Sequence, residues 1–147
     1  MPDQKITGKG RILALDLGKK RIGLAVSDPL GITAQGLPTL ERTNIRQDMS
    51  NIAQLILEWQ VTLLLMGNPL HMSGDSGRQA AYVHEFGARL AEHTGTPMKY
   101  WDERLTTVEA HRVLRSSGIG IEKRARAIDK LSAVILLESY LDSGAEW

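Results

Sequence analysis

One carboxylate, Asp16, interrupts a run that is otherwise apolar at nearly every position between residues 11 and 17. An apolar run of this length predicts a strand that is covered on both faces and lies centrally in its sheet. Burial of an ionised carboxylate costs free energy and raises its pKa, unless a cation or a hydrogen-bond donor compensates the charge. A bound divalent metal ion explains an aspartate in this strand most directly, so we expect Asp16 to be a metal ligand.

A chain of 147 residues suits one compact domain whose core needs no disulfides. We expect a flexible leader over residues 1–10, a single domain over residues 11–142 and a C-terminal tail over residues 143–147. The apolar runs are too short to span a bilayer, and the leader lacks the apolar segment of a secretion signal. These features predict a cytoplasmic protein with no membrane partner. The absence of cysteine excludes thiolate-bound zinc and a cysteine nucleophile.

The net charge is only +1, but the basic residues are unevenly distributed. Residues 1–28 carry six Lys or Arg against three acidic residues, and residues 104–130 carry seven against three. Two basic segments that each contain a candidate metal ligand would suit a polyanion held over metal-binding carboxylates. Alternatively, these side chains only solvate turns and helix faces.

The first half of the chain predicts a three-stranded meander followed by a helix. A glycine-bracketed basic turn separates the first strand from the second, and residues 31–40 predict a third strand that Pro38 places at an edge. A helix from about Asn44 follows, and residues 62–66 predict a short buried strand. The helix carries an apolar stripe of Ile45, Met49, Ile52, Ile56 and Trp59.

The second half alternates helices with one further strand. A loop over residues 67–77 leads into a helix near Ser76, where Ser76 and Gln79 have capping-box spacing and Val83, Phe86 and Leu90 form the apolar stripe. Residues 98–103 predict a fifth strand. Thr106 and Glu109 open the next helix, and a last helix begins near Ala125 with Ile128, Leu131, Val134 and Leu141 facing inward.

The resulting order, β-β-β-α-β-α-β-α-α, is typical of the α/β class and predicts a mixed five-stranded sheet with helices on both faces. Ligands of open α/β sheets bind at the carboxyl ends of the central strands. Asp16 and Glu103 both lie near such ends, so the candidate site is at this edge.

Three carboxylates from distant segments, Asp16, Glu103 and Asp129, are candidate ligands for hard divalent cations. A pair of such ions can activate a water and stabilise the leaving oxygen of a phosphodiester. Each assignment has an alternative. Asp129 also fits a first-turn acid that stabilises the helix dipole, and Glu103 fits an exposed strand end. Asp102 could replace Glu103, although strand alternation directs the two toward opposite faces.

Four motifs follow one another along the chain. They are Asp16-x-Gly18-x-x-Arg21-x-Gly23-x-Ala25-x-Ser27-Asp28, Gly67-x-Pro69-Leu70 with Gly74, Asp102-Glu103-Arg104-Leu105-Thr106-Thr107, and Asp129 with Ala133. In this order they resemble the bacterial YqgF family, also called RuvX, a group of Holliday junction resolvase-like proteins similar to RNase H-like nucleases. The resemblance spans residues 11–142. Asn68 departs from it, because the family usually has an apolar or basic residue between this glycine and proline.

The resemblance implies an RNase H-like fold and a nuclease assigned to 5′-end maturation of pre-16S rRNA. It also implies that Asp16, Glu103 and Asp129 form the acidic triad, for which we expect Mg²⁺ or Mn²⁺ as the cofactor. The expected partners are structured RNA or branched DNA, with ribosomal particles, and the expected state is a monomer or weak homodimer. Whether Asp28 or Asp102 assists the triad stays open.

Five basic residues are candidates for binding substrate. Arg104, beside the triad, could hold a phosphate through two hydrogen bonds. The others could contact backbone phosphates or solvate a hairpin turn and a helix face. These four are Lys19, Lys20 and Arg21 in the basic turn, and Arg124 near Asp129.

Three rival functions stay open. The substrate of the nuclease could be a DNA junction rather than RNA. The motif that begins at Asp16 also resembles the first phosphate loop of actin- and hexokinase-like ATPases, although a chain of this length provides only one of their two lobes. A noncatalytic nucleic-acid-binding factor could carry the same carboxylates.

Overall fold

The computed structural model describes residues 10–68, 75–102 and 120–144. Within these residues, no helix is both long enough and apolar enough to cross a membrane. The elements, in chain order, are β1 (Arg11–Leu17), β2 (Arg21–Ser27), β3 (Ala34–Glu41), α2 (Ile45–Trp59), β4 (Val61–Asn68), α3 (Asp75–Thr94), β5 (Met98–Asp102) and α5 (Ile121–Asp142).

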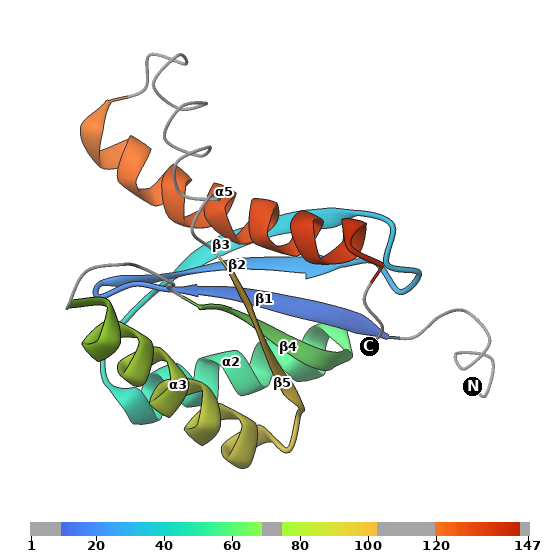
Figure 1. The fold of residues 1–147 in the computed structure, drawn as a ribbon, viewed down its shortest axis with the longest axis horizontal. Coiled ribbons are helices and arrows are strands. Elements are labelled where there is room, and N and C mark those ends of the chain that lie inside the picture. Colours follow the sequence, from blue (N-terminus) through green and yellow to red (C-terminus); the bar gives the residue numbers. More distant parts are fainter. Residues whose placement is uncertain (1–9, 69–74, 103–119, 145–147) are drawn as a thin grey trace.

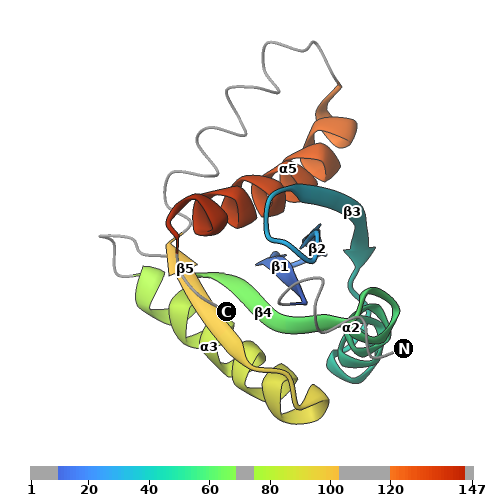
Figure 2. The same cartoon turned by 90° about the vertical axis from the view of Figure 1, so that its right-hand side faces the viewer.

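The strands form one mixed sheet in the order β3-β2-β1-β4-β5. The first three strands are an antiparallel meander, whereas β4 runs parallel to both β1 and β5. Helix α5 covers one face of the sheet, and α2 and α3 cover the other (Figures 1 and 2). The predicted α/β architecture is therefore confirmed, including the central place of β1 and the edge place of β3.

Strand β1 lies in the middle of the sheet and contributes side chains to two hydrophobic cores, one on each face. Leu13, Leu15 and Leu17 pack toward α2 and α3, whereas Ile12 and Ala14 pack toward α5. Burial of each large aliphatic side chain contributes on the order of 2 kcal/mol to stability. The alternation of β1 thus determines which of its residues faces which helical layer.

Small residues let α5 lie close to the sheet. Ala14 pairs with Ala25, which in turn pairs with Gly36, and the buried Ala133 of α5 belongs to the same core. A Cβ added at Gly36 would lie 2.7 Å from Cε of Lys130 and 3.2 Å from Cγ2 of Val134. Large side chains along this row would push the helix away.

The two predicted helices on the other face are confirmed. The Asn44 side chain caps α2 by accepting a hydrogen bond of 2.9 Å from the Gln47 amide. In α2, Met49, Ile52 and Ile56 are buried. The predicted stripe of α3, Val83, Phe86 and Leu90, is also buried.

Several predicted boundaries were wrong. Strand β4 continues through Gly67 and Asn68, because β5 provides a pairing partner that the residue pattern could not reveal. Helix α3 begins at Asp75, so Ser76 lies inside its first turn and is not the cap residue. Strand β3 begins at Ala34 because the preceding residues form a loop organised by Asp28. The helix predicted to open at Thr106 lies outside the described residues.

Helix α5 differs most from the prediction. It begins at Ile121 rather than near Ala125, after Gly120, which offers no side-chain cap. Its polar first turn lacks the apolar periodicity on which the prediction depended. The predicted inward face was partly right. Val134 and Leu141 are half-buried and pack against the core under α5. Ile128 and Leu131 are also only half-buried, and the prediction missed the fully buried apolar residues Ala133, Leu136, Leu137 and Tyr140.

Asp28 organises the loop between β2 and β3. Its Oδ1 accepts hydrogen bonds from the amides of Ile32 at 2.7 Å and Thr33 at 2.6 Å, and its Oδ2 accepts one from Leu30 at 3.1 Å. Burial raises the pKa of this carboxyl, but the hydrogen bonds with Thr33, Ile32 and Leu30 outweigh it, so the pKa lies below 3.8. These contacts give Asp28 a structural role.

We predict that Asp28→Asn lowers the melting temperature at pH 7. The loss in the free energy of unfolding should be no more than about 1 kcal/mol, because the loop is solvated. A carboxylate with a depressed pKa contributes stability above the pKa of the unfolded state and loses it as the pH falls. The difference between wild type and variant should therefore shrink below about pH 4. Thermal melts from pH 7 to pH 2.5 test this, and a difference that stays constant across the range would contradict it.

Candidate active site

Asp16 lies near the carboxyl end of β1, on the face of the sheet that α5 covers. It shares this face with Ile12 and Ala14, four and two positions earlier in the strand. The side chain is half-buried rather than fully buried, which corrects the expectation from its apolar surroundings. The carboxylate is therefore at the sheet centre and still within reach of solvent.

Glycines on both neighbouring strands explain this partial exposure. Asp16 is paired with Gly23 of β2. On the other side the register pairs Leu15 with Met66, so the next position of β4 is Gly67. Neither neighbour has a side chain to cover the carboxylate. The spacing between Asp16 and Gly23 was visible in the sequence, but the role of Gly67 required the register.

The parallel strands β1, β4 and β5 end at the same edge, as the topology predicted. In β5, Trp101 pairs with Gly67 and Asp102 pairs with Asn68. By alternation, position 102 belongs to the α3 face with Asn68, opposite the face of Asp16. Position 102 is thus poorly placed to join Asp16. Glu103 and Arg104 lie outside the described residues.

Helix α5 starts over the carboxyl-terminal edge of the sheet and runs back along it (Figure 1). Because α5 begins at Ile121, position 129 lies more than two turns inside the helix, so the first-turn interpretation of Asp129 was wrong. Position 129 precedes the buried Ala133 by one turn on the same helix face. Arg124 also belongs to α5, and the side chains of both residues lie outside those the structure describes.

The basic turn joins β1 to β2 beside the candidate site. Its ends are held by a hydrogen bond of 3.0 Å from the Gly18 amide to the Arg21 carbonyl. A Cβ at Gly18 would lie 2.7 Å from that carbonyl oxygen, so the turn requires glycine there. Lys19 and Lys20 are exposed, whereas Arg21 is half-buried. The two lysines can therefore meet a phosphate backbone.

Arg42 supports this turn and was missed by the sequence analysis. Its Nη1 donates to the Gly18 carbonyl at 2.9 Å, and its amide donates to the Lys20 carbonyl at 2.9 Å. Its Nε donates to Oδ2 of Asp48 at 3.1 Å, and the two side chains are only 10% and 1% exposed. The buried ion pair thus connects the turn to helix α2.

The surroundings of Arg42 match its charge. The guanidinium lies 5.2 Å from the ring centre of Phe86 and 5.7 Å from that of Tyr82, both on α3. Burial lowers the pKa of Arg42, but hydrogen bonds with Tyr82 and Asp48 outweigh this effect and raise the pKa above its ordinary value. In the sequence, Asp48 resembles an ordinary first-turn acid of α2, which hid the pair.

Asn68, the departure from the family pattern, links β4 to α3. Its Oδ1 lies 3.1 Å from Nε2 of His84, whose ring stacks on Tyr100 with ring centres 4.1 Å apart. Burial raises the pKa of the Tyr100 hydroxyl. Nowhere among the described side chains do three His, Asp or Glu form a metal-binding group. The contacts among Asn68, His84 and Tyr100 hold α3 against the end of β4.

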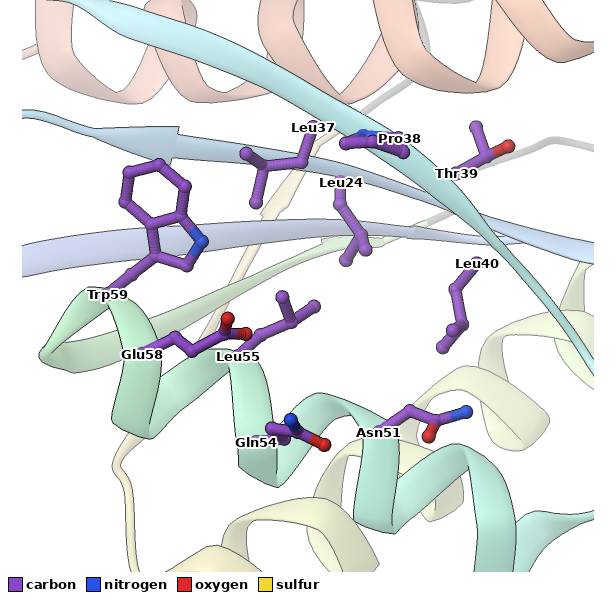
Figure 3. Close-up of a pocket in the computed structure, with 10 residues that line it drawn as sticks. All are labelled: Leu24, Leu37, Pro38, Thr39, Leu40, Asn51, Gln54, Leu55, Glu58 and Trp59. Carbon is purple, nitrogen blue, oxygen red and sulfur yellow. The ribbon is translucent and has the colours of Figure 1, made fainter.

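The two tryptophans of interest pack against helices. Trp101 donates a hydrogen bond of 3.0 Å to Oγ of Ser139 and meets the edge of Tyr140. Trp59 lines a pocket of about 470 Å³ between β3 and α2 (Figure 3). Leu24 and Leu37 in that pocket belong to the core facing α2 and α3, so the pocket opens on the opposite side of the sheet from Asp16.

We predict that Asp48→Ala lowers the free energy of unfolding by on the order of 3 kcal/mol, because it leaves the Arg42 charge buried without its partner. The double variant Arg42→Met/Asp48→Leu should lose less, since it buries no charge. Urea denaturation measures both. A double variant that is less stable than Asp48→Ala would contradict this account of the pair.

Comparison with known proteins identifies the family. The family model described as "RuvX: Holliday junction resolvase" matches residues 10–143. A protein of Koribacter versatilis named "Putative pre-16S rRNA nuclease" is 50% identical over 133 residues, which cover 90% of this chain and 87% of that protein. A protein of Desulforamulus reducens with the same name is 46% identical over 136 residues, which cover 92% of this chain and 99% of that protein.

Solved structures show the same fold at low sequence identity. Thermus thermophilus RuvC in complex with a Holliday junction matches with a TM-score of 0.59 and 11% identity, covering 93% of this chain and 98% of that chain. The fowlpox virus resolvase, also solved with junction DNA, matches with a TM-score of 0.54 and 12% identity over 92% and 99% of the two chains. These likenesses confirm the predicted RNase H-like fold, and the family match shows that this chain belongs to the RuvX family.

Proposed function

We propose that this protein is a nuclease that hydrolyses phosphodiesters of structured nucleic acid, and that its substrate is the 5′ end of pre-16S rRNA. The observation that carries the proposal is the placement of Asp16. It combines a half-buried carboxylate at the carboxyl end of the central strand with two glycine neighbours, in a member of the RuvX family. The names of the relatives support the choice of substrate.

Asp16, Glu103 and Asp129 are the proposed catalytic and metal-binding triad. Alternation along β5 assigns position 101 to the face of Asp16 and position 102 to the other, which favours Glu103 over Asp102. Position 129 precedes Ala133 by one turn of α5. Glu103 itself lies outside the described residues, so its place in the triad is a proposal that rests on the family resemblance.

The donor set fits a hard divalent cation, Mg²⁺ or Mn²⁺, because carboxylate oxygens are the ligands these ions prefer. When bound, two such ions supply an activated water and stabilisation of the leaving oxygen. The protein's own contribution is to hold its carboxylates at a fixed separation. Gly23 and Gly67, the neighbours of Asp16 in the register, add no side chain beside its carboxylate.

Basic residues are proposed to hold the substrate. Lys19 and Lys20 are exposed in a rigid turn next to Asp16, where they can contact phosphates without reading sequence. Arg21, Arg104 and Arg124 are proposed as further phosphate contacts. The protein would act in the cytoplasm on ribosomal particles, as a monomer or weak homodimer.

The second candidate substrate is a four-way DNA junction, which the description of the family model favours. Cleavage assays with precursor rRNA and with junction DNA, in matched salt and metal, distinguish the two substrates. Binding of either without cleavage would instead favour a noncatalytic factor.

We predict that Asp16→Asn reduces cleavage by on the order of 10²- to 10³-fold while leaving the fold and nucleic-acid binding intact. The substitution removes charge and almost no volume. Asp142→Asn, an exposed acid in the last turn of α5, is the matched control and should cleave like wild type. Full activity of a folded Asp16→Asn protein would rule out the assignment.

We also predict that Mg²⁺ or Mn²⁺ raises the melting temperature of the wild type. Ligand binding to the folded state alone stabilises by about 2.7 kcal/mol at a hundred times the dissociation constant. Asp16→Asn should weaken this response, and Asp142→Asn should retain it. Thermal melts across a metal titration provide the measurement, and identical responses in all three proteins would argue against a metal at Asp16.

A further inference from the structure

A groove of about 500 Å³ lies between α2 and α3, on the opposite side of the sheet from Asp16. Its floor includes the buried Met49, and its walls carry two arginines, one on each helix. The lining residues are Ile45, Arg46, Met49, Arg89, Glu92 and His93. The groove thus combines apolar side chains with two arginines, a histidine and one carboxylate, Glu92.

Both guanidiniums are available to a ligand. Arg46 and Arg89 are exposed, and within the described part of the chain neither has a hydrogen bond or an ion pair. The acid nearest to Arg46 along α2, Asp48, is already paired with Arg42 and is 1% exposed. Guanidiniums bind phosphate through two parallel hydrogen bonds, so unpaired arginines on facing walls favour a phosphate-bearing ligand.

The groove lies between the same two helices, α2 and α3, whose side chains contact Arg42 beside the basic turn. Arg42 binds the backbone of this turn at Gly18 and Lys20, and its guanidinium lies against Tyr82 and Phe86 of α3. Arg46 follows Arg42 by four residues, and Arg89 follows Phe86 by three residues of α3, which is just under one helical turn. The two arginines of the groove are therefore close in sequence to the residues that hold the basic turn.

We propose that the groove between α2 and α3 is a second binding site for the sugar–phosphate backbone of the substrate, outside the segment that reaches Asp16. This inference rests on the proposed function and adds a contact to it. Arg46 and Arg89 hold phosphates, and the apolar floor contacts the intervening sugars. A double helix carries one charge per about 1.7 Å of its axis, so a substrate that extends past the basic turn toward α2 and α3 presents phosphates to these arginines.

Binding by catalytically inactive protein tests the proposal. The dissociation constant for RNA is measured with the Asp16→Asn protein at salt concentrations from about 50 to 200 mM. Affinity that comes from phosphate contacts falls steeply over this range. One probe is a short RNA hairpin, and the other is the same hairpin extended by about one helical turn of duplex. Arg46→Gln/Arg89→Gln is expected to weaken binding of the extended RNA about tenfold and to reduce its salt slope by about two.

Three controls keep the result interpretable. Thermal melts verify that the double variant is folded. Arg46→Lys/Arg89→Lys should restore the salt slope, because lysine retains the charge, without fully restoring affinity. Lys99→Gln, which removes an exposed cation on β5 next to Tyr140, is compared with Arg89→Gln and should leave the slope for the extended RNA unchanged.

An unchanged salt slope in the folded double variant, or equal losses for the short and extended RNA, would overturn the proposal. The outcome is separable from the proposed function. If wild-type protein cleaves neither rRNA nor junction DNA but the length-dependent effect persists, the nuclease assignment fails and the groove contact stands.

Discussion

The buried ion pair between Arg42 and Asp48 fixes the parts of the molecule that surround the candidate site. Taking two charges out of water costs several kcal/mol per ion, and this cost is offset only when the remaining hydrogen-bonding groups are satisfied. Here Asp48 also accepts from the Thr43 amide, and Arg42 also donates to the Gly18 carbonyl. One guanidinium therefore couples the basic turn, the start of α2 and the aromatic face of α3.

At the centre of the sheet, the Asp16 carboxylate must stay within reach of solvent although its strand is covered on both faces. A carboxylate in a strand covered on both faces would ordinarily be desolvated by its neighbours. Gly23 and Gly67 remove the side chains that would do this, while Leu15 and Leu17 of the same strand remain buried on the opposite face. One strand can thus contribute both to the core and to an open polar site.

Much of this arrangement could be predicted from the sequence. In β1, α2 and α3, the apolar pattern of the residues matches the faces that the structure buries. The apolar run around Asp16, the helix start near Asn44 and the edge proline are local signals, and the structure confirms them. The start of α5 was not predictable, since Gly120 gives no cap signal. Its inward face was predicted only in part, since the small residues beneath the helix lie on three strands. Pairing between residues distant in sequence, as in Arg42 with Asp48, has no periodic signature.

The edge strand β3 has a consequence for how this protein behaves at high concentration. Exposed strand edges present unpaired amides and carbonyls that can recruit the edge of another molecule. Pro38 lacks an amide hydrogen, and the register between β2 and β3 shifts between the Ile22–Leu40 and Leu24–Leu37 pairs, next to that proline. A missing donor and an irregular register interrupt the template at one point. This edge is consequently a poor template for continuous sheet extension from one copy to the next.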